Sequence, residues 1–367
     1  MVVSDSETLK NSGDVHMSEA LRYGINLDLI SRWMDELGVD HTGPLHLDRI
    51  GLGQSNLTFL VVDSRDREWV LRRPPLGQLL ASAHDVLREA RILDALLKTS
   101  VPVPKILGWT DDPDVVGAPV VLMEYVDGLV VDRMEVAHRL TFDQRERIGF
   151  ALPDALAKIH SIEPAAVGLG QLTKSKTTYA TRQLRRWSEQ WQHSRTREIA
   201  DLDDLTRRLW DAIPDQKETT LVHGDFHLLN VIMSPEMSRV SAVLDWELCT
   251  LGDPLADLGT LLAYWPAEGE QTGALNTMST LPGFPTRSEL IDCYLEKSRR
   301  SGDDLGFWHA LGLWKIAVIA EGALRRTDDN PDNRSAAEGS AVEWAPTVEW
   351  IDSLVENARD VAAKAGI

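Results

Sequence analysis

The sequence predicts an α+β chain in which a small, strand-rich lobe precedes a larger, mainly helical lobe. Two observations support this prediction. Short alternating or β-branched apolar runs, separated by Gly, Asn, Asp and Arg, fill much of residues 45–125. Beyond Gly128, apolar residues recur at helical spacing over long segments. We therefore expect a disordered tail over residues 1–22, a first lobe over 23–126 and a second lobe over 127–367.

The first lobe is predicted to contain an early helix over residues 27–37 and a second helix over 82–97. In the second helix, Val86, Ala90 and Leu93 recur with a helical period, and the Pro-containing segment 101–104 ends it. Strands are predicted around these helices, over residues 45–50, 58–62, 69–72, 105–109 and 119–125.

The second lobe is predicted to be built from amphipathic helices with one pair of short strands. The strands, 220–222 and 240–244, flank the most polar motif of the chain. Residues 327–340 are polar and contain a proline, which favours a loop. Helices are predicted over residues 142–160, 178–194, 200–213, 288–299, 305–326 and 345–364.

Composition narrows the class of protein. An apolar share of 43% and a charged share of 26% over 367 residues are ordinary for a globular chain, and the net charge of −19 argues against a nucleic-acid partner. Cys249 and Cys293 lack the spacing of a disulfide framework or a zinc site, which fits a reducing compartment. The first twenty residues lack the pattern of a signal peptide, and no apolar run reaches about 18 residues. We expect a cytoplasmic protein without a membrane span.

Residues 221–230 and 242–246 carry the most informative polar groups. His223-Gly224-Asp225 is followed by Asn230 and, after an apolar run, by Asp245. Phosphoryl transfer needs one carboxylate to orient a substrate hydroxyl, and an Asn with a second carboxylate to hold Mg²⁺ on nucleotide phosphates. This combination indicates a phosphoryl-transfer site.

The same segment allows a second interpretation. His223, Asp225 and His227 alternate, so an extended chain would place all three on one face, as in a zinc-dependent hydrolase. Asn230 and Asp245 favour the first interpretation, because a hard, oxygen-rich pair suits Mg²⁺. Further along, Asp257 falls near a helix start and is interpreted as a structural cap or loop anchor.

A glycine-containing segment between the first two strands is a candidate phosphate loop. Gly51 and Gly53 would let the backbone approach a phosphate, and Ser55 and Asn56 would add side-chain donors. The alternative interpretation of this segment is a plain hairpin turn.

Two further features of the first lobe suit a nucleotide. Arg72, on the third strand, would pair with phosphates and with Glu89 of the following helix. The backbone from Glu124 to Val126 would bind an adenine edge, although a strand-to-loop junction is equally compatible. The alternative for Arg72 and Glu89 is ordinary surface charge.

Together these residues resemble the aminoglycoside phosphotransferase-type kinases, especially the branch similar to kinase-like domains fused to some acyl-CoA dehydrogenases. The resemblance extends from about Leu45 to Arg326. It is carried by Gly53-Gln54-Ser55-Asn56, Val70-Leu71-Arg72, Arg88-Glu89, Met123-Glu124-Tyr125, His223-Gly224-Asp225 with Asn230, and Leu244-Asp245-Trp246-Glu247.

The resemblance implies a two-lobed, protein-kinase-like fold that transfers the γ-phosphate of ATP to a hydroxyl of a small molecule. In that family pattern Asp225, within its His223-containing motif, is the catalytic base, and Asn230 and Asp245 bind Mg²⁺. Arg72 stands where most such kinases carry Lys, and its guanidinium is bulkier and has a fixed fork. A nucleotide-binding pseudokinase is therefore the alternative.

The acceptor is expected at the helices that precede the His-Gly-Asp motif, as in related kinases. Arginines and tryptophans there would suit an anionic hydroxy acid or its CoA thioester better than a cationic aminoglycoside. Surface charge and core packing are the other explanation, and an aminoglycoside kinase remains an alternative. The residues concerned are Arg182, Arg185, Arg186, Trp187 and Trp191, with Trp246 and Glu247 as further candidates.

Overall fold

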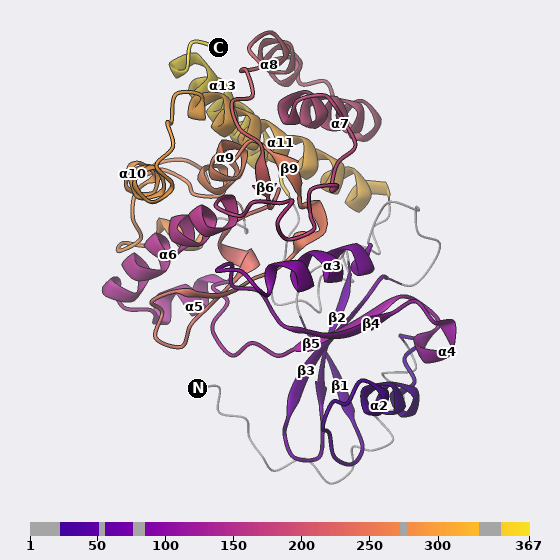
Figure 1. The fold of residues 1–367 in the computed structure, drawn as a ribbon. Coiled ribbons are helices and arrows are strands. Elements are labelled where there is room, and N and C mark those ends of the chain that lie inside the picture. The colour runs from indigo at the N-terminus through magenta and orange to yellow at the C-terminus, as the bar shows by residue number, and fades with distance from the viewer. Residues whose placement is uncertain (1–22, 51–55, 76–84, 272, 274–276, 330–345) are drawn as a thin grey trace. The chain divides into compact units, whose positions relative to one another are not determined.

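The computed structural model describes residues 23–50, 56–75, 85–271, 273, 277–329 and 346–367 (Figure 1). The chain divides into two compact units. The first contains the described residues up to Leu97 together with Pro104–Val126, and the second contains Lys98–Val103 with Asp127–Ile367. The expected tail over residues 1–22 lies outside the described residues.

The first unit is a five-stranded antiparallel sheet with the strand order β1-β2-β3-β5-β4. One face is apolar because Phe59, Leu71 and Leu122 lie side by side in register on neighbouring strands and are fully buried. Helix α2 (Leu27–Glu36) packs on this face through Ile30 and Trp33. The strands are β1 (His46–Ile50), β2 (Leu57–Val62), β3 (Glu68–Arg73), β4 (Ile106–Thr110) and β5 (Val120–Glu124).

Helix α3 (Val86–Leu96) packs against β4 and β5. Side chains alternate along a strand, so Arg72 of β3 points away from the Leu71 face and meets Glu89 of α3. The helix starts later than the sequence predicts, because Asp85 is its N-cap and accepts a hydrogen bond from the Arg88 amide. The earlier residues 82–84 of the predicted helix lie outside the described part of the chain.

The second unit is mainly helical and contains two short antiparallel ribbons. Strand β6 (Thr220–Val222) pairs with β9 (Thr250–Gly252), and β7 (Val231–Met233) pairs with β8 (Val240–Val243). The helices are α5 (Met134–Arg139), α6 (Phe142–His160), α7 (Tyr179–Ser194), α8 (Ala200–Asp211), α9 (Leu255–Ala263), α10 (Arg287–Ser298), α11 (Leu305–Asp329) and α13 (Val348–Lys364). The three-residue 3₁₀ turns are η1 (Leu228–Asn230), η2 (Trp246–Leu248) and η3 (Met278–Thr280).

Helix α11 is the buried centre of the second unit and contacts α7, α8, α9 and α13 (Figure 1). It crosses α9 at two glycines. A Cβ on Gly312 would lie 2.8 Å from the Gly259 carbonyl oxygen, and a Cβ on Gly259 would lie 2.4 Å from the Trp308 carbonyl. The two helices approach this closely because glycine has no side chain. The close approach brings Lys315, almost one turn beyond Gly312, near the β6–β7 loop.

The α+β class and the main helices agree with the sequence prediction, but several short elements were not predicted. Strands β7 and β9 have three residues each, too few for a periodic signal. All nine residues of α9 are buried, so it has no polar face to reveal a helical period. Helix α11 continues to Asp329, so the loop predicted from Thr327 begins later, and residues 330–340 of that loop lie outside the described chain.

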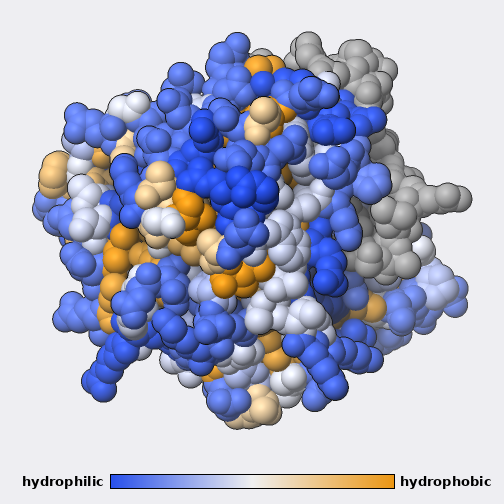
Figure 2. All heavy atoms as spheres, turned by 90° about the horizontal axis from the view of Figure 1, so that it is seen from above, coloured by the Kyte–Doolittle hydropathy of each residue, from blue (hydrophilic) through white to orange (hydrophobic). Residues whose placement is uncertain are grey.

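The face drawn in Figure 2 is mostly hydrophilic, with hydrophobic side chains gathered in small, separate patches. Among the described residues, no helix combines the length and the apolar character needed to cross a bilayer.

Candidate active site

The loop that follows β6 turns sharply at Gly224. This residue has a φ of +86°, and a Cβ there would lie 2.8 Å from the carbonyl oxygen of Leu248. Glycine is therefore required for both backbone conformation and space. The turn directs the chain into Asp225, the expected base.

His223 supports the loop through both of its ring nitrogens. Its Nε2 donates to the carbonyl oxygen of Leu244 at 2.8 Å, and its Nδ1 accepts from the Asp225 amide at 3.2 Å. Burial lowers the pKa of His223, which favours the neutral ring that can make both bonds. With both nitrogens engaged by the backbone, the ring is not available as a metal ligand, so the geometry disfavours the zinc-hydrolase interpretation.

Asp257 of α9 anchors the same loop from inside the protein. Its carboxylate accepts hydrogen bonds from the backbone amides of His223 at 2.6 Å and Gly224 at 2.8 Å. The His160 Nε2 lies 3.2 Å from Asp257 Oδ2, while His160 Nδ1 lies 2.7 Å from the Tyr294 hydroxyl. Burial acts to raise the pKa of Asp257, but the His160 hydrogen bond and charge hold it below its ordinary value. The interpretation of Asp257 as a loop anchor is confirmed.

Asp225 is half-buried and bound by the residues that follow it in the chain. Asn230 Nδ2 donates to the Asp225 carbonyl oxygen at 2.9 Å and lies 3.4 Å from its Oδ2. His227 Nε2 lies 3.5 Å from the same carboxylate oxygen. Burial acts to raise the pKa of Asp225, but His227 and Lys315 hold it below its ordinary value. The group is therefore an ionised hydrogen-bond acceptor at neutral pH.

Asn230 and Asp245 are brought together by the β7–β8 ribbon. Val231 pairs with Val243, and the Leu244 amide donates to the Asn230 carbonyl oxygen at 2.8 Å. The next residue, Asp245, has the left-handed conformation with φ 64° and ψ 61°, which non-glycine residues rarely adopt. The Asn230 amide nitrogen is engaged by Asp225, which leaves its amide oxygen as the candidate cation ligand. An amide and a carboxylate oxygen fit Mg²⁺.

The first unit contains the nucleotide candidates that the structure describes. Arg72 Nη1 lies 3.1 Å from Glu89 Oε1, with the Arg72 side chain 15% and the Glu89 side chain 3% exposed. The side chain of Asn56 is buried, and its amide has no hydrogen-bond partner among the described residues. Buried polar groups are normally paired, so this orphan amide fits a site that a ligand completes.

The other nucleotide candidates have a less informative placement. Gly51, Gly53 and Ser55 lie outside the described residues. Glu124 ends β5, is exposed, and donates its backbone N–H to the Lys105 carbonyl oxygen at 2.9 Å. Val126 follows it and is partly buried. The adenine contact expected from Glu124 to Val126 stays a prediction.

The acceptor candidates divide into structural and exposed residues. Arg182 donates to the carbonyl oxygens of Thr177 at 2.7 Å and Leu251 at 2.5 Å, so its guanidinium links α7 to β9. Trp191 is buried and donates to Asp203 at 2.8 Å. Trp246 is fully buried and donates to the Val243 carbonyl oxygen at 2.9 Å. These three side chains pack the scaffold instead of forming an acceptor surface.

Trp187 and Glu247 are only partly buried. Trp187 is partly buried on α7 and donates its indole N–H to Gln183 at 3.0 Å. Glu247 is partly buried in η2, two residues after Asp245. Arg185 and Arg186 of α7 are exposed.

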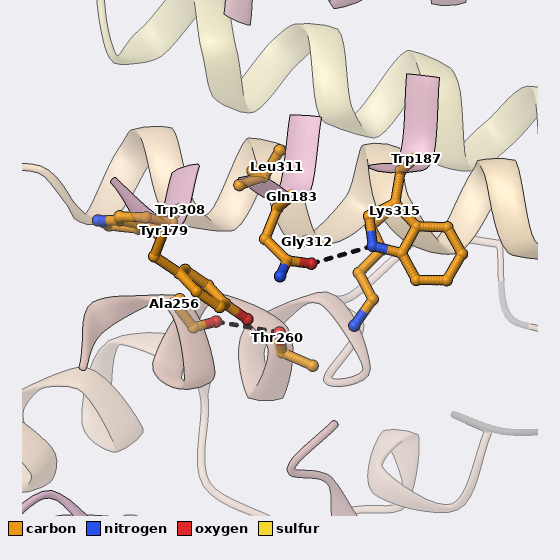
Figure 3. A pocket seen from close by; sticks show the side chains of 9 residues that line it. All are labelled: Tyr179, Gln183, Trp187, Ala256, Thr260, Trp308, Leu311, Gly312 and Lys315. Carbon is orange, nitrogen blue, oxygen red and sulfur yellow. Dashed lines mark hydrogen bonds between the residues drawn. The ribbon is translucent and has the colours of Figure 1, made fainter. Parts of the chain in front are cut away.

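A small pocket lies between α7, α9 and α11 and contains a residue that we did not predict (Figure 3). Lys315 of α11 lines this pocket and donates to the Gly224 carbonyl oxygen at 2.7 Å. Burial lowers the pKa of Lys315, and the charge of Asp225 opposes this shift. The sequence did contain a signal, because Lys315 is the single charge in the apolar run from Leu311 to Ala320.

Comparison with known proteins assigns the chain to a family. The model of the phosphotransferase enzyme family matches residues 46–289, more than half of the sequence. The chain belongs to this family. It is 36% identical over 334 residues to mouse acyl-CoA dehydrogenase family member 10, covering 90% of this chain and 30% of that protein. The chain thus spans under a third of the length of this relative.

Solved structures with a similar fold identify the fold of this chain. A Ralstonia eutropha protein whose name places it among the aminoglycoside phosphotransferases matches with a TM-score of 0.73 and 29% identity. The match covers 92% of this chain and 98% of that one. The APH(2″)-IIa ternary complex with streptomycin and ATP matches with a TM-score of 0.53 at 15% identity, over 81% of this chain and 90% of that one. The expected aminoglycoside phosphotransferase-type, protein-kinase-like fold is confirmed.

Proposed function

We propose that the chain transfers the γ-phosphate of Mg-ATP to a hydroxyl group of a small molecule. The observation that supports the proposal is the hydrogen bonding that joins Asp225 to Asn230 and Asn230 to the segment just before Asp245. The Asn230 side chain donates a hydrogen bond to the Asp225 carbonyl oxygen. The Leu244 N–H donates to the Asn230 carbonyl oxygen, which fixes the backbone immediately before Asp245. One carboxylate for the acceptor and an amide–carboxylate pair for the cation are the set that phosphoryl transfer requires.

The carboxylate of Asp225 orients the acceptor. The hydroxyl donates a hydrogen bond to this ionised group, which aims its oxygen at the γ-phosphorus. The new O–P bond forms as the bond from γ-phosphorus to the bridging oxygen breaks, ADP departs with that oxygen, and the hydroxyl proton passes to Asp225. Asn230 and Asp245 would hold Mg²⁺, which when bound offsets the negative charge of the phosphates.

The nucleotide is assigned to the first unit. Arg72, held by Glu89, supplies a fixed cation for phosphate oxygens, and the unpaired Asn56 amide supplies donor and acceptor atoms. Backbone contacts from Gly51, Gly53 and Ser55, and an adenine contact near Glu124 and Val126, belong to the same proposal. The ATP named in the APH(2″)-IIa complex supports the choice of nucleotide.

The acceptor is proposed to be an anionic hydroxy acid or its CoA thioester. Arg185 and Arg186 place exposed guanidinium groups on α7, next to Trp187. These groups attract carboxylates and phosphates and repel a polycationic aminoglycoside. The acyl-CoA in the name of the mouse relative agrees with an acyl-type acceptor. We do not include Arg182 and Trp246 in the proposed acceptor site, because both side chains are hydrogen-bonded to backbone carbonyl oxygens of the second unit.

The test is turnover of a panel of compounds with Mg-ATP. Purified protein is incubated with hydroxy acids, hydroxyacyl-CoA thioesters and aminoglycosides, and phosphorylated products are detected by mass spectrometry. Asp225→Asn is expected to lower the rate by about 10²–10⁴-fold while Mg-ATP still binds. A wild-type chain that neither binds Mg-ATP nor phosphorylates any compound refutes the proposal.

A pseudokinase is the second candidate, and Arg72 in place of the usual Lys is the observation that favours it. Thermal stabilisation by Mg-ATP without transfer to any member of the panel would select it. Phosphorylated aminoglycoside alone would instead select an antibiotic kinase.

A further inference from the structure

The two carboxylate oxygens of Asp225 have different surroundings. Its Oδ2 lies 3.4 Å from the Asn230 amide nitrogen and 3.5 Å from His227 Nε2. Within the part of the chain that the structure describes, Oδ1 has no hydrogen bond or ion pair, and the Asp225 side chain is 25% exposed. A carboxylate that is held at one oxygen can accept a further hydrogen bond at the other.

Hydrogen bonding determines which nitrogen of the His227 ring carries the proton. The Leu229 backbone N–H donates to His227 Nδ1 at 3.3 Å. Because a backbone N–H can only donate, Nδ1 is the bare nitrogen, and the neutral ring carries its proton on Nε2. This Nε2–H is a donor, and Asp225 Oδ2 is the carboxylate oxygen near it.

Asn230 supplies a second donor at the same place. Its amide is oriented by the bond from Nδ2 to the Asp225 carbonyl oxygen at 2.9 Å. The distance from Nδ2 to His227 Nε2 is 3.2 Å, but two donors do not bond each other. Both therefore serve Asp225 Oδ2. Contacts of 3.4 and 3.5 Å are long, and catalytic hydrogen bonds often shorten when the substrate binds.

The His227 ring is held in place on two sides. It is 6% exposed, and as the N-cap of η1 it is fixed at Nδ1 by the Leu229 N–H. Its ring packs against Tyr264, with the ring centroids 4.3 Å apart and the planes inclined by 37°. Tyr264 is the C-cap of α9, about two turns beyond the loop anchor Asp257. One helix thus supports both the Asp225 loop and the ring beside it.

We propose that His227, supported by the Tyr264 ring, is a positioning residue that together with Asn230 holds Oδ2 of Asp225 and leaves Oδ1 for the acceptor hydroxyl. The inference rests on the proposed phosphotransferase function and names the oxygen that receives the proton. As the acceptor oxygen forms its bond to the γ-phosphorus, its O–H bond breaks and the proton passes to Oδ1, while the bond from the γ-phosphorus to ADP breaks. His227 transfers no proton; its N–H stays on Oδ2 and fixes the angle at which Oδ1 meets the hydroxyl.

Two substitutions of His227 separate this role from that of a cap and a stacked ring. Asn has its side-chain oxygen at the same bond distance from Cβ as His Nδ1, so His227→Asn keeps the acceptor for the Leu229 N–H and loses the donor for Oδ2. Gln has its amide nitrogen at the same bond distance from Cβ as His Nε2, so His227→Gln keeps the donor and loses the cap. Both variants lose the ring on Tyr264.

The first experiment locates the ring proton without turnover. The full chain is labelled with ¹⁵N-histidine and studied by NMR at pH 8, where an ordinary histidine is neutral. The His227 signals are identified by their absence in His227→Gln. We expect a protonated Nε2 and a bare Nδ1, and an Nε2 signal that shifts in Asp225→Asn because the acceptor loses its charge. A proton on Nδ1, or an Nε2 signal that Asp225→Asn leaves unchanged, overturns the proposal.

The second experiment measures turnover of Mg-ATP with the compound that wild type phosphorylates. His227→Asn is expected to lower kcat at least tenfold with the ATP KM unchanged within threefold, and kcat of His227→Gln is expected to be at least fivefold higher than that of His227→Asn. Urea unfolding is expected to give the reverse order, with His227→Asn the more stable variant because it keeps the cap. Equal kcat values, or a higher kcat for His227→Asn, overturn the proposal, since the cap and the ring then explain His227.

Tyr264 provides an independent variant. Tyr264→Leu removes the stacked ring and is expected to lower kcat more than Tyr264→Phe, which keeps it. In the His227→Asn background Tyr264→Leu is expected to cause no further loss, because its effect passes through His227. Additive losses overturn the support of His227 by Tyr264. Failure of the phosphotransferase proposal is distinct, because wild type then forms no product while NMR still locates the His227 proton.

Discussion

The carboxylate of Asp257 accepts the backbone N–H of Gly224 at 2.8 Å, and this bond fixes the loop that presents Asp225. The same carboxylate accepts the His223 amide, so one buried side chain satisfies two successive backbone donors. Asp257 therefore controls the position of the proposed base, Asp225, although the two residues are far apart in the sequence.

Asp257→Ala is expected to destabilise the protein by about 3–5 kcal/mol, because it leaves buried donors without their charged partner. Urea unfolding measures this change. Asp154→Asn is the control, since its ion pairs with Lys158 and Lys297 are partly exposed and worth about 0–1 kcal/mol. Equal losses for the two variants would contradict the anchoring role of Asp257.

The Arg72–Glu89 pair provides a prediction about the nucleotide. Glu89→Gln keeps the shape of the side chain but removes the charge that orients the guanidinium. We expect the ATP KM to rise about tenfold or more, because the uncharged amide holds the Arg72 guanidinium less firmly than the carboxylate does. Steady-state kinetics with varied ATP measures this effect. Arg49→Met, a change on strand β1, which β2 separates from β3, should leave the ATP KM unchanged. An unchanged ATP KM in Glu89→Gln would remove the pair from the nucleotide site.

The raised pKa of Asp253 leads us to expect that the free energy of unfolding depends on pH. Burial raises the pKa of this carboxyl to about 6, and the nearby charges of Asp304 and Glu218 add to the shift. The ordinary value is 3.8, so above about pH 6 the folded state carries an ionised group that the unfolded state tolerates better. As the pH falls from 6 towards 4, the folded state takes up the proton first and this cost disappears.

Asp253→Asn is therefore expected to raise stability by about 1–3 kcal/mol at pH 7.5 and to have little effect at pH 4. The amide oxygen still accepts the Leu255 N–H that Asp253 Oδ1 accepts at 3.0 Å. Thermal unfolding at both pH values measures the change, and the exposed Asp303→Asn serves as the control. A stabilisation that is the same at pH 4 would mean that ionisation of Asp253 is not its cause.

The candidate site residues named from the sequence in the second unit are close together in the chain, and a candidate from a distant helix was missed. Asp225, Asn230 and Asp245 were proposed because their residue types and spacing form a motif. Lys315 was not, because its contact with Gly224 depends on the glycine crossing of α9 and α11, which no local pattern encodes. Arg182 and Trp246 were chosen by residue type, yet burial and hydrogen bonding decide their role. The α+β class followed from periodicity, whereas the three-residue strands β7 and β9 and the fully buried α9 have no period to read.

Gly224 provides the most direct test of how tightly the loop controls activity. Gly224→Ala places a methyl group 2.8 Å from the Leu248 carbonyl oxygen, at a φ of +86°. Gly168 is the matched control, because its φ is +79° but no atom lies within 4 Å of an added Cβ. Gly168→Ala therefore measures the conformational cost alone, about 1–2 kcal/mol. Gly224→Ala adds the collision and moves Asp225 away from the acceptor. We expect a larger loss of stability and at least a hundredfold fall in kcat for Gly224→Ala, with kcat unchanged for Gly168→Ala. Equal kcat values for the two variants would show that the geometry of Gly224 does not limit the reaction.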